Sequence, residues 1–232
     1  ARARAHTHTH THTHTHKHTH AQVVSTDVVF MLADVRYTVN IPEGLPHMVL
    51  TPDWTDLLRA EAATLAPLVK YDRKPSDCAM MAMTSGSSGK PKAVIVSHQA
   101  TTMAFAARYE VFPYDENDIE ASHIFFVWEC LRGPLRGLPV HVISEEILTD
   151  PPQLVRFMRE RKTTRVVLTA QLTQSVLDYP NLDLATELQH MKFWMLCGEV
   201  CPSALAKQWG KRVPNVNLIN YYGSWEALDI TY

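Results

Sequence analysis

Glycine and cysteine are both scarce in this chain of 232 residues, which has eight glycines and four cysteines. Glycine is about half as frequent as its usual ~7%, so each glycine is expected where the backbone needs its freedom. The cysteines are too few and too scattered for a disulfide scaffold, which favours a protein of a reducing compartment.

Long hydrophobic segments are also missing. No apolar run exceeds six residues, whereas a membrane-spanning helix needs about 20. No charged start followed by an apolar stretch indicates a secretory signal. Hydrophobic residues nevertheless make up 46% of the chain, which excludes wholesale disorder. These features predict a soluble, cytoplasmic protein with a folded core and no membrane span.

The first twenty residues lack any pattern that could build a core. They are Ala-Arg-Ala-Arg-Ala followed by an almost strict His-Thr alternation. Because a CA repeat in DNA is translated as His-Thr and a GC repeat as Ala-Arg, we interpret residues 1–20 as a translated simple repeat, disordered in the protein. Alternatively, an extended chain would place the imidazoles on one face, where they could bind Zn, Ni or Cu loosely.

The remainder, residues 21–232, lacks a basic surplus. It carries 19 basic and 24 acidic residues, a formal charge of −5. This balance does not provide the excess of positive charge that binding to nucleic acid or to an anionic membrane requires. Its 212 residues are enough for one large domain.

Short apolar segments alternate with longer amphipathic segments in this globular part. Strands are expected at residues 78–83, 93–96, 139–143, 165–168, 191–196 and 216–219, and helices at 56–66, 98–112, 154–162, 172–177 and 202–209. The alternation predicts an α/β domain with a largely parallel sheet. In such sheets the functional residues gather at the carboxyl ends of the strands.

Residues 84–92, Thr-Ser-Gly-Ser-Ser-Gly-Lys-Pro-Lys, contain no hydrophobic residue and are expected to form a loop. Its hydroxyls and glycine-freed backbone N–H groups can wrap phosphate oxygens, and a lysine adds a positive charge. The alternative is an ordinary solvated hairpin loop. A Walker loop needs four residues between the glycines and Ser or Thr after the lysine, so P-loop kinase and GTPase chemistry is disfavoured.

The order of these residues resembles the Thr-Ser-Gly-Thr-Thr-Gly-x-Pro-Lys-Gly loop of the adenylate-forming superfamily. That superfamily comprises acyl-CoA synthetases, luciferases and the adenylation domains of nonribosomal peptide synthetases. The resemblance implies that the loop holds the β- and γ-phosphates of ATP, with Lys92 in the family lysine position. The implied loop ligands are Thr84, Ser85, Gly86, Ser87, Ser88, Gly89 and Lys92.

Three later segments follow in the order found in the family. Residues 127–129, Val-Trp-Glu, resemble a segment of peptide-synthetase adenylation domains, in which the aromatic residue forms a wall of the acyl pocket. Residues 196–199, Leu-Cys-Gly-Glu, resemble the Gly-Gly-Glu turn beside the adenine, which implies that Gly198 and Glu199 lie at the nucleotide. A metal site at Cys197 and Cys201 is an alternative, but no third ligand lies nearby in the sequence.

Residues 220–226, Asn-Tyr-Tyr-Gly-Ser-Trp-Glu, resemble the family motif Asn-x-Tyr-Gly-Pro-Thr-Glu. The implied roles are adenine stacking by Tyr222, nucleotide binding beside Gly223, and Mg²⁺ binding by Glu226; these suit an aromatic face and a hard carboxylate ligand. Trp225 stands where the family has the threonine that contacts the α-phosphate, and Ser224 is the hydroxyl that could substitute. Lys92 and Glu226 are the implied catalytic residues.

Alignment to these motifs predicts which residues line the acyl pocket: Ile124, Phe125, Trp128, Met195, Cys197, Tyr221, Asp229 and Ile230. Domains that activate α-amino acids have an aspartate at the place of Ile124, where it pairs with the substrate ammonium. A buried ammonium without a partner is costly. We therefore expect a non-α-amino or apolar carboxylic acid, with Asp229 available to an amine placed differently.

The resemblance implies that the full enzyme uses MgATP to convert a carboxylic or amino acid to an acyl-adenylate. It then transfers the acyl group to coenzyme A or a carrier-protein phosphopantetheine. The resemblance covers residues 77–232, the middle of the large N-terminal domain, with mostly parallel sheets flanked by helices. The C-terminal lid with its lysine and the ribose-binding Thr-Gly-Asp segment have no counterpart in the chain.

A partial adenylation core is therefore expected over residues 21–232, as a fragment of a larger synthetase or of a stand-alone acyl-CoA synthetase. An inactive nucleotide-binding or interaction protein is the other possibility. In isolation the fragment is expected to expose apolar surface and to be poorly soluble.

Overall fold

The computed structural model describes residues 31–34, 41–51, 53, 56, 72–84 and 92–232, except the side chains of 32–34 and 124–127. Within these residues the chain divides into two compact units. One contains the described residues up to Asp77 together with Met81–Ile95, and the other contains Cys78–Met80 and Val96–Tyr232. Each unit is described by itself. The predicted boundary at residue 20 lies outside the described residues.

The second unit is built on a five-stranded sheet in the order β6-β5-β7-β8-β9. The strands are β5 (Glu120–Ser122), β6 (Val140–Val142), β7 (Arg165–Leu168), β8 (Phe193–Leu196) and β9 (Asn217–Asn220). Every neighbouring pair is parallel. The predicted α/β fold with a parallel sheet is therefore confirmed, and the carboxyl ends of the strands meet at one edge.

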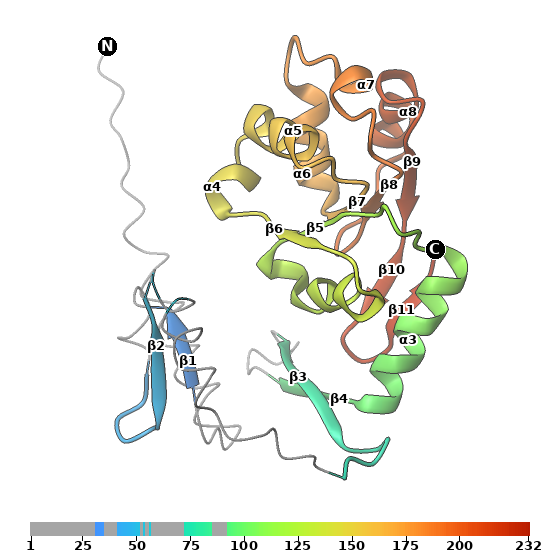
Figure 1. Ribbon diagram of the computed structural model, residues 1–232. Coiled ribbons are helices and arrows are strands. Elements are labelled where there is room, and N and C mark those ends of the chain that lie inside the picture. Colours follow the sequence, from blue (N-terminus) through green and yellow to red (C-terminus); the bar gives the residue numbers. More distant parts are fainter. Residues whose placement is uncertain (1–30, 35–40, 52, 54–55, 57–71, 85–91) are drawn as a thin grey trace. The chain divides into compact units, whose positions relative to one another are not determined.

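Helices cover both faces of this sheet (Figure 1). They are α3 (His98–Val111), α4 (Glu145–Leu148), α5 (Pro151–Glu160), α6 (Ala170–Asp178), α7 (Leu184–Glu187) and α8 (Ser203–Arg212), with 3-10 helices η2 (Ile124–Leu131) and η3 (Pro134–Arg136). The main core cluster joins α5 through α8 to one face. Phe112, which follows the last residue of α3, and Trp128 of η2 pack on the opposite face.

The two central strands show why both faces must be covered. In β7, Val166 and Leu168 join the main cluster, whereas Val167 between them joins the cluster on the opposite face. Trp194 and Met195 of β8 divide between the faces in the same way. Side chains alternate along a strand, so a strand buried on both faces appears in the sequence as a continuous apolar run.

Side-chain caps fix where α3 and α5 begin. Asp150 accepts a hydrogen bond from the backbone N–H of Gln153 at 3.1 Å, and two prolines open α5. Ser97 caps α3 in the same way through the N–H of Ala100 at 3.1 Å. Because a capping oxygen satisfies an N–H that the helix leaves unpaired, these polar residues made both helix starts predictable from the sequence.

The remaining strands form three two-stranded sheets. They are β1 (Met31–Asp34) with β2 (His47–Leu50), β3 (Cys78–Thr84) with β4 (Lys92–Ser97), and β10 (Tyr222–Ser224) with β11 (Leu228–Thr231). The strands predicted at 78–83 and 93–96 are confirmed to within one residue. Of the helix expected at 56–66, only Asp56 lies within the described residues, and it is helical. The part of the chain that is described contains no helix long and apolar enough to cross a membrane.

Candidate functional site

The residues that follow β8 and β9 lie at the carboxyl edge of the sheet. Cys197 follows β8 directly and Tyr221 follows β9, and these strands are parallel neighbours. Gly198 has a φ of +83°, a left-handed conformation that favours glycine. The parallel sheet therefore brings the segments 197–199 and 220–226 side by side, although they are far apart in sequence.

A cavity of about 200 Å³ opens at this edge. It is lined by Trp128, Cys197, Gly198, Tyr221, Gly223, Ser224, Trp225, Leu228 and Asp229. Four of the predicted acyl-pocket residues therefore share one cavity, which we call the acid cavity. Met195 is buried beside Arg108 and Ile230 is 51% exposed, and neither belongs to this lining. The side chains of Ile124 and Phe125 lie outside the described residues.

A second cavity of about 530 Å³ adjoins the first, and we call it the nucleotide cavity. It is lined by Gly198, Glu199, Val200, Cys201, Asn220, Tyr221, Tyr222 and Gly223. Tyr222 is 62% exposed, so its ring is available to a ligand. Gly198, Tyr221 and Gly223 line both cavities. A ligand in one cavity and a ligand in the other would therefore share a wall.

A larger space of about 630 Å³ lies beyond Trp128. Its lining comes mainly from α3 and from the 3-10 helices, including Phe105, Tyr109 and Leu135. Trp128 lines this space and the acid cavity, so its indole forms a wall of each.

The β10–β11 hairpin, which is far from Trp128 in sequence, brings four side chains to the acid cavity: Ser224, Trp225, Leu228 and Asp229. Residues 225–227 form its turn, and Leu228 follows with a φ of +56°. The Trp225 ring lies 4.5 Å from the Trp128 ring, centroid to centroid, with the planes at 69°. Gly223 and Asp229 pair across the two strands. A Cβ at Gly223 would lie 2.5 Å from the carbonyl oxygen of Leu228, so the strands approach this closely only because glycine is present.

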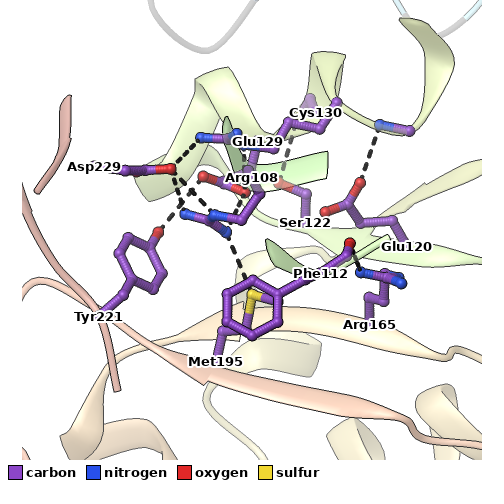
Figure 2. Close-up of polar contacts among 12 residues, drawn as sticks. Arg108, Phe112, Glu120, Ser122, Glu129, Cys130, Arg165, Met195, Tyr221 and Asp229 are labelled. Atoms are coloured by element: carbon purple, nitrogen blue, oxygen red, sulfur yellow. Dashed lines mark hydrogen bonds and ion pairs between the residues drawn. The ribbon is translucent and has the colours of Figure 1, made fainter. Parts of the chain in front are cut away.

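Buried ion pairs hold Asp229 in place, as Figure 2 shows beside Arg108 and Glu129. Asp229 Oδ2 accepts hydrogen bonds from Arg108 Nη2 at 2.7 Å and Arg132 Nη2 at 3.0 Å. Glu129 Oε2 lies 3.1 Å from Arg132 Nε. All four side chains are at most 5% exposed. Two guanidinium groups balance two carboxylates, which is the condition for keeping such charges buried.

The same contacts shift the ionisation of the site. Burial acts to lower the pKa of Arg108, but the carboxylates of Glu129 and Asp229 outweigh it and raise that pKa. Burial raises the pKa of the Tyr221 hydroxyl, and the Glu129 carboxylate raises it further. Burial also raises the pKa of the Cys197 thiol. Tyr221 and Cys197 are therefore neutral at physiological pH, whereas the Asp229 carboxylate is paired with the guanidinium groups of Arg108 and Arg132.

The predicted phosphate loop is described only at its two ends. Thr84 is the last residue of β3 and Lys92 the first of β4, and Thr84 Oγ1 donates a hydrogen bond to the Lys92 carbonyl oxygen at 3.4 Å. Ser85, Gly86, Ser87, Ser88 and Gly89 lie outside the described residues. Lys92 is exposed.

Glu226 is exposed in the hairpin turn and is absent from both cavity linings. Lys92 and Glu226 belong to different units, so their convergence on one nucleotide stays a prediction. Among the described residues, no group of three or more His, Cys, Asp or Glu side chains gathers that could hold a metal ion.

Sequence reasoning missed several residues of the site. Leu228 lines the acid cavity, and Trp225 was noted only as a departure from a phosphate-binding motif. Arg108 and Arg132, which hold Asp229, were not singled out at all. Their one sequence signal is a charged residue on an otherwise apolar helix face, as at Arg108 in α3 beside buried Phe105.

Comparison with known proteins gives consistent matches. A family model described as AMP-binding enzyme matches residues 1–232. The glycine betaine reductase ATRR of Emericella nidulans is 30% identical over 152 residues, which are 66% of this chain and 12% of that protein. The beta-alanyl-bioamine nonribosomal peptide synthetase ebony of Drosophila melanogaster is 32% identical over 205 residues, which are 82% of this chain and 23% of that protein. The chain thus spans less than a quarter of the length of these two relatives.

Solved structures share the fold at lower identity. ATP-bound MatB from Rhodopseudomonas palustris matches with a TM-score of 0.74 at 16% identity, over 90% of this chain and 43% of that chain. VinN in complex with L-aspartate matches with a TM-score of 0.72 at 21% identity, over 90% of this chain and 54% of that chain. With the matched family model, these likenesses lead to one conclusion: the chain belongs to the AMP-binding enzyme family.

Proposed function

We propose that this chain is part of an enzyme that activates a small carboxylic acid as its acyl-adenylate. A carboxylate oxygen attacks the α-phosphorus of ATP, the bond to the bridging oxygen breaks, and pyrophosphate leaves. The acyl group then passes to the thiol of coenzyme A or of a carrier-protein phosphopantetheine. The observation that carries the proposal is the shared wall of the acid and nucleotide cavities, because the reaction needs an acid and a nucleotide side by side.

The chain's own residues fit a nucleotide in the larger of these two cavities. The exposed ring of Tyr222 offers a face to a purine, and the absence of a side chain at Gly198 and Gly223 lets a ligand approach the backbone. Thr84, Lys92 and the loop between them would bind the β- and γ-phosphates. Glu226, an exposed carboxylate on a turn, would hold Mg²⁺. When bound, Mg²⁺ neutralises charge on the departing pyrophosphate.

The substrate proposed here is not an ordinary α-amino acid. Ile124 occupies the place from which, in the resemblance, an aspartate pairs with an α-ammonium. Two relatives are named for acids that need no such partner: glycine betaine has a fully methylated nitrogen, and a beta-alanyl group carries its nitrogen beyond the α-carbon. We further propose that the protein is cytoplasmic and that a carrier-protein domain is its partner.

Trp225 supports a second candidate function, nucleotide binding without catalysis. It replaces the threonine that the resemblance assigns to the α-phosphate, and its ring packs on Trp128 instead. If Ser224 does not supply the missing hydroxyl, the protein would bind ATP and not turn it over.

Exchange of labelled pyrophosphate into ATP, measured on the full-length protein with a panel of acids, tests both candidates. Acid-dependent exchange is expected. Tyr222→Ala should raise the KM for ATP about tenfold, since stacking of a base on an aromatic ring contributes ~1–3 kcal/mol. The exposed Tyr179 at the end of α6 supplies the control, Tyr179→Ala, which should leave the KM unchanged. ATP binding without exchange would favour the second candidate, and the loss of both would reject the nucleotide site.

A further inference from the structure

Aromatic rings and one carboxylate dominate the acid cavity. Trp128 and Trp225 line it with ring planes at 69°, so the two indoles form a corner. Tyr221 contributes a third ring, but the guanidinium carbon of Arg108 already lies 4.3 Å from that ring's centroid. Trp128 and Trp225 both line the cavity, and tryptophan is the best side chain for binding a cation through its ring face.

Among the described residues, every hydrogen bond to the Asp229 carboxylate reaches the same oxygen, Oδ2. Arg108, Arg132 and Tyr232 all donate hydrogen bonds to Oδ2, at 2.7 to 3.2 Å. Within the part of the chain that the structure describes, Oδ1 accepts no hydrogen bond, although the residue lines the acid cavity. The arginines thus pair with one carboxylate oxygen of Asp229 and leave the other available to a ligand.

The charges around the cavity decide which ligands suit it. No lysine, arginine or histidine is among its described lining residues, so a second carboxylate on the substrate would find no cationic partner there. A wholly apolar tail would cover Asp229 Oδ1 without replacing its hydration, which is unfavourable. A positively charged group meets both the indole faces and the free carboxylate oxygen.

We propose that the acid cavity selects a carboxylic acid that carries a positively charged nitrogen, recognised by Trp128, Trp225 and Asp229. The nitrogen is either a methylated ammonium, which needs no hydrogen-bond acceptor, or a primary ammonium beyond the α-carbon, which can donate to Oδ1. The inference rests on the proposed function and specifies its substrate class.

Matched acids that differ in charge but not in shape test this proposal. Glycine betaine and its neutral isostere 3,3-dimethylbutyrate form one pair, and β-alanine and butyrate form the other. In the exchange assay at least one cationic acid should exceed its neutral isostere about tenfold in kcat/KM, the size of effect expected when a desolvated cation meets a tryptophan face. The pair with the larger ratio identifies the kind of nitrogen. Equal or higher values for both neutral acids would overturn the proposal.

Variants connect the preference to the named residues. Trp225→Leu should reduce the ratio between charged and neutral acid to near one, whereas Trp225→Phe, which keeps a ring, should retain much of it. Asp229→Asn should weaken β-alanine more than glycine betaine, because only the primary ammonium donates a hydrogen bond. Since Asp229 belongs to the buried ion pairs, its variant is interpreted only if its thermal melt matches the parent. The Trp225 pair tests the proposal independently of that outcome. An unchanged ratio in Trp225→Leu would contradict the assignment.

A binding measurement separates this inference from the proposed function. Tryptophan fluorescence of the full-length protein is followed while each acid is added without ATP. If no acid supports exchange, the proposed activation fails, but tighter binding of the charged member of a pair would still support a cation-selective cavity. If exchange proceeds with neutral acids as well as with charged ones, activation stands and the inference fails.

Discussion

At the scale of single residues, Glu120 is a buried acidic group in an unusual environment. Its carboxyl group lies within the fold and accepts hydrogen bonds from the Tyr114 hydroxyl at 3.2 Å and the backbone N–H of Gly133 at 3.1 Å. Burial raises the pKa of Glu120 from 4.5 to about 8, and the nearby carboxylate of Glu129 acts in the same direction. Glu120 is therefore mostly a neutral acid at physiological pH.

This shift predicts a pH dependence of stability. The pKa of Glu120 is higher in the folded state than in the unfolded state. The contribution of its protonated carboxyl group to the free energy of unfolding is therefore complete below pH 4.5 and is lost as the pH rises through about 8. Glu120→Gln keeps a neutral acceptor and should remove this dependence, making the protein more stable than the parent at pH 8 by about 1–3 kcal/mol. Urea unfolding at pH 5 and pH 8 measures the difference. The exposed Glu116 gives the control Glu116→Gln, and parallel pH profiles for parent and Glu120→Gln would refute the prediction.

Residue identity allowed part of the site to be predicted. Trp128, Cys197 and Tyr221 were assigned to one pocket from motif order, and they line the same cavity. The position of Asp229 in that cavity was also expected, but its ion pair with Arg108 was not, because 121 residues separate the two. Sequence patterns report neighbours along a helix or strand, and such a long-range contact leaves no periodic signal.

At the scale of secondary structure, the long elements followed the sequence closely. α5 and α8 were expected within a few residues of their observed bounds, because apolar periodicity, proline and capping residues all indicate helix. Short elements give a weaker signal in the sequence than long ones, because few residues contribute to it. α4, α7 and the β10–β11 hairpin have three or four residues per element and were not assigned. The hairpin is polar and aromatic, so its pairing depends on the contacts it makes with the rest of the site.

Close approach of the hairpin strands makes Gly223 sensitive to substitution. In Gly223→Ala the new methyl group would lie 2.5 Å from a backbone oxygen, so β10 and β11 must separate. We expect a loss of about 1–3 kcal/mol in unfolding free energy and a change in tryptophan fluorescence as Trp225 moves from Trp128.

Gly210, in the interior of α8, provides the matched control. A Cβ there meets no atom within 4 Å, so Gly210→Ala should stabilise the protein by about 0.5–1 kcal/mol through helix propensity. Thermal melts of both variants decide the matter, and equal effects of the two alanines would show that the hairpin tolerates wider spacing.

At the scale of the whole second unit, the ion pairs around Asp229 connect three elements distant in sequence. Arg108 comes from α3, Glu129 from η2 and Asp229 from β11. The network therefore fastens the hairpin and the 3-10 helix to the helix on their face of the sheet. Removing one charge would leave the others buried and uncompensated.

Arg108→Leu should therefore lower the free energy of unfolding by about 3–5 kcal/mol, the usual cost of breaking a buried ion pair. The matched control is the same substitution at Arg156. The ion pair of Arg156 with Glu160 lies on the surface, with side chains 68% and 51% exposed. Arg156→Leu should cost less than about 1 kcal/mol. Denaturant unfolding of the two variants provides the comparison, and similar losses would mean that the buried network does not hold the unit together.

The wall common to the two cavities has a thermodynamic consequence. Two ligands that contact opposite sides of Tyr221, Gly198 and Gly223 are not expected to bind independently. By linkage, whatever factor a saturating acid applies to the Kd of the nucleotide, the saturating nucleotide must apply to the Kd of the acid. Cooperativity between substrates would then need no moving domain, because a single tyrosine and two glycines would suffice to transmit it.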